Sequence, residues 1–199
     1  MICSMILHGI QRNAWIRIKQ VEYDGVNMSV EHGCSQVVMT SGMHIRRAET
    51  RDIEQLHKLL RQVLEVHHAG RPDLFKTGVT KYTNDELCTI LANERTPVFG
   101  AFADDDVTLL GYALCIFQQH EHSNILTDIT TLYIDDLCVD ESARGQHIGT
   151  ALYQHVLDVA RSAGCYNVTL NVWSCNPGAQ AFYERLGLTP YKVGMEQIL

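Results

Sequence analysis

The sequence predicts an α/β (α+β) fold in which one mixed, mostly antiparallel sheet of six or seven strands is flanked by helices. Segments with hydrophobic residues every three or four positions alternate with segments in which every second residue is hydrophobic, so helices and strands follow one another. Short polar turns join the central strands and favour antiparallel pairing. A helix joins the run 131–139 to the run 167–173, which favours a parallel pair with a right-handed crossover.

The composition is that of one soluble globular domain with an added segment. The chain has 199 residues, of which 46% are hydrophobic and 20% charged. No apolar run approaches the roughly 20 residues that a membrane helix needs. The net charge of -7 disfavours a nucleic-acid partner, which normally meets a basic surface. We therefore expect neither a membrane nor a nucleic-acid partner.

The cysteines indicate a reducing compartment. All 7 are scattered without a C-x-x-C pair, and several lie in apolar runs. Such a set is typical of reduced thiols in a cytoplasm. Residues 1–10 have neither the basic start nor the apolar length of a secretory signal, so we expect a cytoplasmic location.

Residues 1–42 form an N-terminal extension without a strong hydrophobic period, in which 14–18 and 36–39 are the candidate strands. We expect this extension to be disordered or an over-long start, and the main domain to be 43–199. Residues 44–48 predict its first strand. Ile53, Leu56 and Leu60 then have helical spacing, and the proline-containing segment 70–73 ends that helix.

The remaining elements follow from caps and alternation. Thr83 and Glu86 form a capping box at the start of a second helix. Residues 98–103 and 107–117 predict a hairpin, 120–128 a polar loop, and 131–139 a strand. A helix runs from Ile148 to the stop signal Gly164. A strand at 167–173, a helix at 179–186 that ends at Gly187, and a last strand at 191–198 complete the order.

The junction between the 131–139 strand and the helix at Ile148 has the features of an anion site. Such a junction directs unpaired backbone N–H groups and the positive end of the helix dipole at one point. Gly145 and Gly149 permit close backbone approach. Arg144 adds a charge and Thr150 a hydroxyl, so a phosphate or pyrophosphate is the expected ligand. The alternative is an ordinary helix cap on a glycine-bearing turn.

A second segment, residues 176–188, combines helix signals with a candidate acid. Asn176 suits an N-cap, Pro177 the first helical position and Gly187 the residue after the helix. Tyr183 has no such structural necessity, so it is a candidate catalytic residue. The alternative is a packed, half-buried tyrosine.

Together the two segments resemble the signature stretches of the GNAT superfamily of N-acetyltransferases, and the resemblance extends from Met43 to Leu199. Residues 144–150 look like the family's cofactor loop, in which an arginine or glutamine is followed three residues later by a glycine. Residues 176–188 are similar to its N-x-x-A-x-x-F-Y-x-x-x-G segment. His147 departs from the pattern, because it replaces the loop's first glycine. Its backbone N–H can serve the site only if a Cβ and a right-handed conformation are accepted there.

The resemblance implies acetyl-coenzyme A as cosubstrate. In that family the strands that correspond to 131–139 and 167–173 splay, and the pantetheine arm enters between them. Residues 137–139 would pair with the arm, 144–150 would hold the pyrophosphate, and the 176–188 segment would lie beside the arm and the thiol. The implied cofactor-binding residues are Leu137, Cys138, Val139, Arg144, Gly145, Gln146, His147, Ile148, Gly149, Thr150, Asn176, Ala179 and Tyr183.

Asp135 and Asp136, in the middle of the 131–139 strand, are the candidate proton acceptors. Since successive strand residues face opposite ways, one should face the cleft and the other away from it. The alternative is a salt-bridged or exposed strand acid. Residues 71–75 are a specificity candidate, because the family places substrate-facing elements there.

Other reactive side chains have simpler explanations. Cys138 could be an acyl-accepting nucleophile, but a buried neutral thiol is the favoured interpretation. His67, His68, His120 and His122 lack zinc-site spacing, so we predict no metal.

The expected activity is direct transfer of an acetyl group, in a ternary complex, to a primary amine of a small molecule or protein, with Tyr183 as general acid. The competing expectation is a catalytically silent acyl-coenzyme A sensor or scaffold. A nicotinamide-binding domain is disfavoured, because the dinucleotide fingerprint is missing from this turn. The sequence names neither the amine nor the oligomeric state, and it leaves a homodimer open.

Overall fold

The computed structural model describes residues 42–199. The expectations for the N-terminal extension, including the strands at 14–18 and 36–39, lie outside the described residues. Across the described part of the chain, no helix is both long and apolar enough to cross a membrane.

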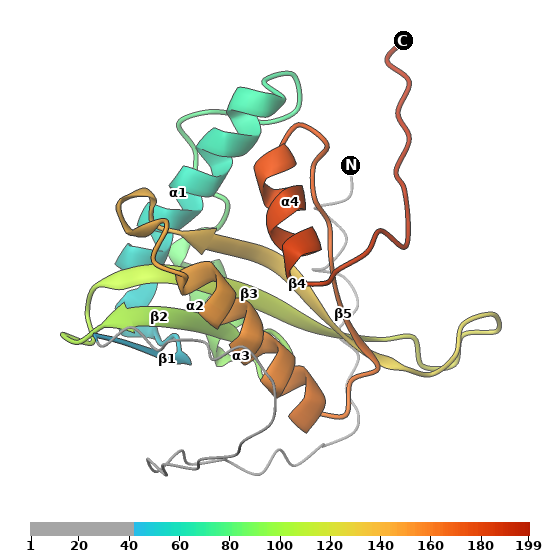
Figure 1. Ribbon diagram of the computed structural model, residues 1–199, viewed down its shortest axis with the longest axis horizontal. Helices are drawn as coiled ribbons and strands as arrows, with labels where there is room; N and C mark the ends of the chain where they lie inside the picture. Colours follow the sequence, from blue (N-terminus) through green and yellow to red (C-terminus); the bar gives the residue numbers. More distant parts are fainter. Residues whose placement is uncertain (1–41) are drawn as a thin grey trace. The chain divides into compact units, whose positions relative to one another are not determined.

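The described chain folds into a five-stranded mixed sheet with helices on both faces (Figure 1). Neighbouring strands in the order β1-β2-β3-β4-β5 are antiparallel, except that β4 and β5 are parallel. The predicted mixed sheet with one parallel pair is thus confirmed. The elements are β1 (Met43–Arg47), a 3-10 turn (Thr50–Asp52), α1 (Ile53–Gly70), α2 (Asn84–Ala92), β2 (Val98–Ala103), β3 (Leu109–Gln119), β4 (Thr130–Val139), a second 3-10 turn (Glu141–Ala143), α3 (Ile148–Ser162), β5 (Asn167–Leu170) and α4 (Pro177–Arg185).

Local signals set the helix ends, as the sequence predicts. The Thr83 hydroxyl accepts the N–H of Glu86 at 3.3 Å, and the Glu86 carboxylate accepts the N–H of Thr83 at 2.7 Å. This reciprocal pair satisfies two amide groups that the first turn of α2 leaves without helical partners. Gly164 and Gly187, just beyond α3 and α4, have φ of 70° and 90°. A residue with a Cβ adopts that conformation only at a cost, so glycine ends both helices.

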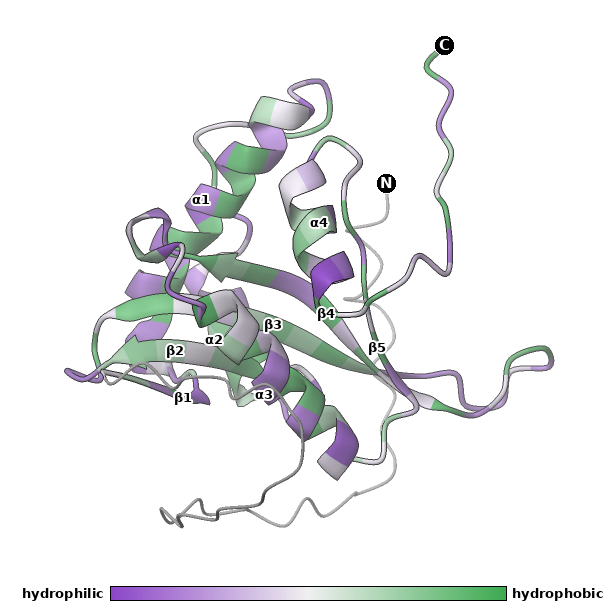
Figure 2. Cartoon of the chain, in the orientation of Figure 1, coloured by the Kyte–Doolittle hydropathy of each residue, from purple (hydrophilic) through white to green (hydrophobic). Residues whose placement is uncertain are grey.

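The sheet buries one hydrophobic cluster on each face. The face covered by α1 and α2, here called the α1 face, buries Leu56, Leu59, Leu60, Leu87, Phe102, Tyr112 and Leu114. The face covered by α3, here called the α3 face, buries Phe99, Ala113, Cys115, Leu132, Ile134, Leu152 and Val156. Each fully buried aliphatic side chain contributes roughly 1.5 to 3 kcal/mol. In Figure 2 the central strands are largely hydrophobic, whereas β4 carries a hydrophilic stretch behind its hydrophobic C-terminal end.

The sheet is smaller than the sequence predicts. The predicted strand at 191–198 is wrong, because this segment forms neither helix nor strand. Tyr191, Val193 and Met195 are 70%, 75% and 91% exposed. These alternating hydrophobic side chains therefore pack against nothing, and strand propensity depends on such packing. The strand predicted at 167–173 ends at Leu170. Beyond it the Trp173 ring packs edge-on against Phe75, with centroids 5.1 Å apart.

Candidate active site

The C-terminal half of β4 has one paired and one open edge. β4 stays paired with β3 as far as Val139, but it pairs with β5 only from Thr131 to Ile134. Among the described strands, none pairs with the β5-side edge of β4 at 135–139 (Figure 1). Backbone N–H and C=O groups on this edge need partners, so an extended ligand arm can complete the sheet there. The expected splay of the two strands is therefore present.

Asp140 fixes the turn that follows β4. Its carboxylate accepts hydrogen bonds from the N–H and the hydroxyl of Ser142 at 3.0 and 2.6 Å. Lys58 of α1 lies 2.6 Å from the same side chain. The hydrogen bonds from Lys58 and Ser142 lower the pKa of Asp140 to about 2. This buried carboxylate ties α1 to the start of the predicted phosphate loop.

Asp140→Asn should therefore destabilise the fold in a pH-dependent way. Because the folded pKa lies below the ordinary value of about 4, the charged carboxylate stabilises the fold above that pH and loses its effect as pH falls through about 2. We expect the variant to lose about 2 kcal/mol of unfolding free energy at neutral pH, and the deficit to shrink towards pH 2. Urea titrations across this range measure the difference. A deficit that does not change with pH would rule out the charge as its cause.

The first backbone N–H groups of α3 have no partners within the helix. No side chain among the described residues caps it, and the side chains of Arg144, Gln146 and His147 are exposed. Gly145 has φ of 82°, and His147 has φ of 61° and ψ of 12°. The right-handed conformation that the sequence analysis set as a condition at His147 is therefore not met, since the chain passes through the left-handed region as it enters the helix. The accessible amides and the Arg144 guanidinium suit an anion.

Packing sets the next residues of α3. Ile148 is 2% exposed and belongs to the α3-face core, so only its backbone is available to a ligand. A Cβ at Gly149 would lie 3.2 Å from the Phe182 ring and 3.4 Å from Cγ2 of Val139. Gly149 therefore lets α3 approach α4 and β4 closely, which is a reason for glycine beyond the expected approach of a phosphate. Thr150 is half-buried in the same turn.

His147→Gly should leave acetyl-coenzyme A affinity equal or improve it. A side chain in the left-handed region costs roughly 1 to 2 kcal/mol of folding free energy, which glycine avoids. Glycine also loses more freedom on folding, which offsets about 0.5 to 1 kcal/mol of the stability gained. Gln146→Gly is the control, because the backbone there is not left-handed and glycine should only destabilise. Calorimetric titration and thermal unfolding measure both variants. Weaker cofactor binding by His147→Gly alone would show that the imidazole itself contacts the ligand.

A β-bulge places both acidic candidates on one face of β4. The register between β3 and β4 shifts so that Asp135 has no residue opposite it. As a result Ile134 and Leu137 both pack on the α3 face. Asp135 and Asp136 both face the α1 side, so the expectation that they point opposite ways is wrong. Strict alternation fails wherever a strand contains an extra residue.

Lys81 lies between the two carboxylates. Its Nζ is 3.0 Å from Oδ2 of Asp135 and 3.1 Å from Oδ2 of Asp136. The Tyr82 hydroxyl donates to Asp135 at 3.3 Å, and the buried Tyr112 hydroxyl donates to Asp136 at 3.0 Å. Both acids are thus salt-bridged, the alternative that the sequence left open. Sequence reasoning missed Lys81, since no spacing rule links a lysine between two helices to a distant strand.

Tyr183 approaches the splay from the other face of the sheet. It lies on α4 and packs against the α3-face core, with ring centroids 5.0 Å from Phe182 and 6.3 Å from Tyr153. Burial raises the pKa of Tyr183, and the negative charge of Asp136 raises it further. The phenol therefore stays protonated at neutral pH and is available as a donor.

Two other candidates have clear structural roles. Asn176 caps α4, because its side-chain oxygen accepts the N–H of Ala179 at 3.1 Å. Cys138 packs beneath α1, with Sγ 3.7 Å from the carbonyl oxygen of Leu59. Burial, reinforced by Asp136, raises the pKa of the Cys138 thiol to about 12. A thiol with this pKa is neutral and a poor nucleophile.

The predicted specificity segment, 71–75, meets the chain beyond β5. The Phe75 ring lies between His67 and Trp173, with centroid distances of 4.9 and 5.1 Å. Arg71 pairs with Asp73 at 2.6 Å and with Glu196 at 2.8 Å. The segment therefore contacts the chain that follows β5, and its role in specificity stays a prediction.

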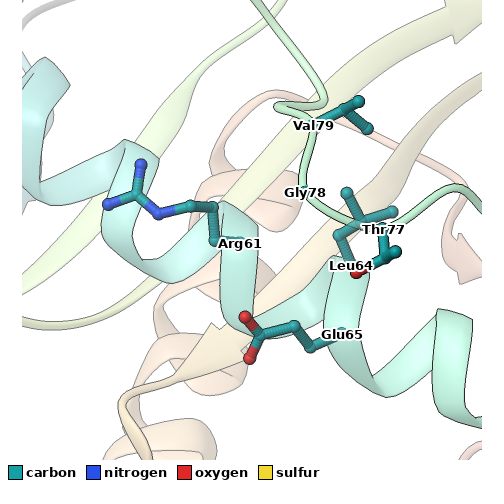
Figure 3. Close-up of a pocket in the computed structure, with 6 residues that line it drawn as sticks. All are labelled: Arg61, Leu64, Glu65, Thr77, Gly78 and Val79. Atoms are coloured by element: carbon teal, nitrogen blue, oxygen red, sulfur yellow. The ribbon is translucent and has the colours of Figure 1, made fainter.

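A small pocket lies apart from this site (Figure 3). None of its residues comes from β4, α3 or α4, so it is separate from the splay. It is formed by α1 and the connection that follows it, and its lining residues are Arg61, Leu64, Glu65, Thr77, Gly78 and Val79.

Residues 58–188 match the acetyltransferase (GNAT) family. N-alpha-acetyltransferase 30 of Schizosaccharomyces pombe is 37% identical over 98 residues, which are 48% of this chain and 61% of that protein. Probable glucosamine 6-phosphate N-acetyltransferase 2 of Oryza sativa subsp. japonica is 33% identical over 63 residues, 32% of this chain and 36% of that protein. The matches thus span less than two thirds of the length of either relative.

A solved structure matches more of the chain. The crystal structure of a mutant of the BH1408 protein from Bacillus halodurans has a TM-score of 0.74 and 29% sequence identity. The match covers 78% of this chain and 99% of that one.

Proposed function

The chain belongs to the GNAT acetyltransferase family, and from this premise we propose that it transfers an acetyl group from acetyl-coenzyme A directly to a primary amine. The observation that carries the proposal is the set of groups around the splay of β4 and β5. Two carboxylates lie on the α1 face, a protonated tyrosine lies on the α3 face, and the N-terminus of α3 follows the end of β4.

The open edge of β4 supports the proposed cofactor site. Acetyl-coenzyme A supplies the acetyl group as a thioester. Backbone groups of Leu137, Cys138 and Val139 would pair with its pantetheine arm, as a strand pairs with a sheet edge. Residues 144–150 would hold the pyrophosphate through the uncapped amides of α3 and the Arg144 guanidinium. Asn176 and Ala179 would border the arm from the start of α4.

The acidic pair supports a role in proton removal. A free alkylamine has a pKa of about 10.4, so at neutral pH it is mostly protonated and must lose a proton before attack. Asp135 or Asp136 would accept this proton, directly or through water. Both carboxylates already bind the ammonium group of Lys81, so their positions suit the nitrogen of an amine.

Tyr183 would complete the reaction as general acid. When the amine nitrogen bonds to the acetyl carbon, the bond between that carbon and sulfur breaks, and Tyr183 would give its proton to the departing thiolate. Backbone N–H groups near Cys138 and Val139 would stabilise the charge on the carbonyl oxygen, at roughly 3 kcal/mol per donor. The neutral, buried Cys138 thiol favours direct attack in a ternary complex over a covalent acyl-enzyme.

A second candidate function is a catalytically silent acyl-coenzyme A sensor or scaffold. One observation favours it: Lys81 already engages both carboxylates. The acceptor of an active enzyme would be a small-molecule or protein amine. The names of the relatives refer to an N-alpha amine and to an amino sugar phosphate, and both are primary amines.

A thiol-release assay with acetyl-coenzyme A and a panel of primary amines separates the two functions. The panel should include alkylamines, polyamines, amino sugars and peptides with free N-termini. The enzyme proposal expects coenzyme A release that depends on at least one amine, together with its N-acetyl product. Thermal protection by acetyl-coenzyme A without turnover on any amine would support the sensor.

A further inference from the structure

The ammonium of Lys81 is held as a bound amine would be. Hydrogen bonds of 3.0 and 3.1 Å join it to Asp135 and Asp136, and its side chain is 24% exposed. Behind it the Tyr112 hydroxyl, with no exposed surface, fixes the Asp136 carboxylate from the side of β3. The site thus accommodates an unbranched alkyl chain that ends in a primary ammonium.

The charges at this position require a cation. Burial would lower the pKa of Lys81, but attraction to Asp136 and Asp135 outweighs burial and raises it. The side chain is therefore protonated at neutral pH. Removing one partner from such a buried group of charges leaves the others uncompensated, which is strongly unfavourable. Another cation that replaced Lys81 would relieve that cost.

The position coincides with the one proposed for the acceptor. Asp135 directly follows Ile134, the last residue of β4 that pairs with β5, so the ammonium lies where the splay begins. An acceptor amine that gives its proton to these carboxylates must approach them as closely as Lys81 does. Lys81 and the acceptor therefore compete for the same partners.

The segment that precedes Lys81 is loosely packed, whereas Tyr82 after it packs against the α1-face core, so withdrawal would involve the Lys81 side chain and the residues before it. The segment belongs to the connection between α1 and α2, residues 71–83, which contains no helix or strand. Thr77, Gly78 and Val79 line the small pocket of Figure 3, so a space separates this part of the connection from α1. Val79 is 44% exposed, and a Cβ at Gly78 would meet nothing within 4 Å.

We propose that Lys81 is the resting occupant of the acceptor site, and that the acceptor is a primary alkylammonium resembling a lysine side chain, which displaces it. This inference rests on the proposed function, because it takes Asp135 and Asp136 as the groups that receive the acceptor. It narrows the acceptor class to flexible, cationic alkylamines and makes Lys81 a determinant of specificity.

Chemical rescue of Lys81→Ala tests the proposal without acetyl-coenzyme A. The substitution removes a propylammonium group from the site, so the variant should melt below the wild type. Added propylammonium should raise its melting temperature by several degrees in a saturable way, because a ligand that binds only the folded state stabilises it. Tetramethylammonium, which has the same charge but no N–H donor, should not. Lys81→Arg, which keeps the cation, should not respond to propylammonium.

No rise with propylammonium, or an equal rise with tetramethylammonium, would overturn the proposal. If Lys81→Ala does not fold, labelling of the wild type decides the question. Acetic anhydride should modify Lys81 more slowly than the exposed Lys192. Propylammonium should increase the ratio of the Lys81 labelling rate to the Lys192 labelling rate. An unchanged ratio would contradict displacement. Since neither measurement involves acetyl transfer, a failure here is distinct from a failure of the amine panel.

Discussion

Tyr183→Phe should lower kcat roughly 10²- to 10³-fold, because it removes the proposed general acid and keeps the ring. A thiol with a pKa of about 8.5 leaves tolerably well unaided, so a donor with a pKa of about 10 or higher gives a moderate gain. Burial keeps the Tyr183 phenol protonated. The contacts of its ring with the α3-face core, Tyr153 and Phe182 do not involve the hydroxyl, and phenylalanine keeps them. Cofactor affinity and melting temperature should therefore change little.

Tyr153→Phe is the matched control for this prediction. Tyr153 is 6% exposed, and its ring centroid lies 6.3 Å from that of Tyr183, but it comes from α3 and has no proposed catalytic role. The control should turn over like the wild type. Wild-type turnover in Tyr183→Phe would remove Tyr183 from the mechanism. A loss of about 1 to 3 kcal/mol in stability together with activity would instead indicate a buried hydrogen bond.

Arg144→Ala should weaken acetyl-coenzyme A binding by about 1.5 to 3 kcal/mol, the range for a hydrogen bond to a charged group, which is roughly a 10- to 150-fold rise in Kd. The guanidinium is exposed at the start of the phosphate loop, and its Nε lies 3.4 Å from the carbonyl oxygen of Val139. It is therefore free to reorient towards an anion at the N-terminus of α3. Titration calorimetry measures the change directly.

Arg161→Ala provides the control for charge alone. Arg161 lies at the other end of α3, where it is 65% exposed and pairs with Asp158. The substitution removes the same charge from the same helix but far from its N-terminus. The Kd for acetyl-coenzyme A should therefore stay near the wild-type value. Equal effects of the two substitutions would indicate long-range electrostatics, and no effect of Arg144→Ala would place the pyrophosphate elsewhere.

The features that the sequence predicts correctly depend on neighbouring residues. The Thr83 and Glu86 capping box, the Asn176 cap and the glycine after α4 each need only a few adjacent positions. The order of the elements along the chain from β1 to α4 follows from hydrophobic alternation, helical spacing and the signals that end helices. The splay of β4 and β5 was implied only by the resemblance of residues 144–150 and 176–188 to the family's signature segments.

The features that the sequence does not predict depend on contacts between distant segments. The bulge at Asp135 arises from the register between β3 and β4, and no residue type in the sequence predicts it. Lys81 meets its carboxylates only because the connection after α1 folds against β4. The left-handed His147 was missed because histidine does not require that conformation as a positive-φ glycine does. The segment 191–198 alternates like a strand but has no face to cover.

The position of the acetyl group after a single turnover tests the central claim most directly. Excess protein is mixed with acetyl-coenzyme A that carries an isotopically labelled acetyl group, together with the most active amine of the panel, and every species is analysed by mass spectrometry. Direct transfer predicts the label on the amine nitrogen, free coenzyme A in equal amount, and unlabelled Cys138. Bound but intact acetyl-coenzyme A would contradict acetyl transfer. Label that passes through a protein side chain before it reaches the amine would contradict direct attack.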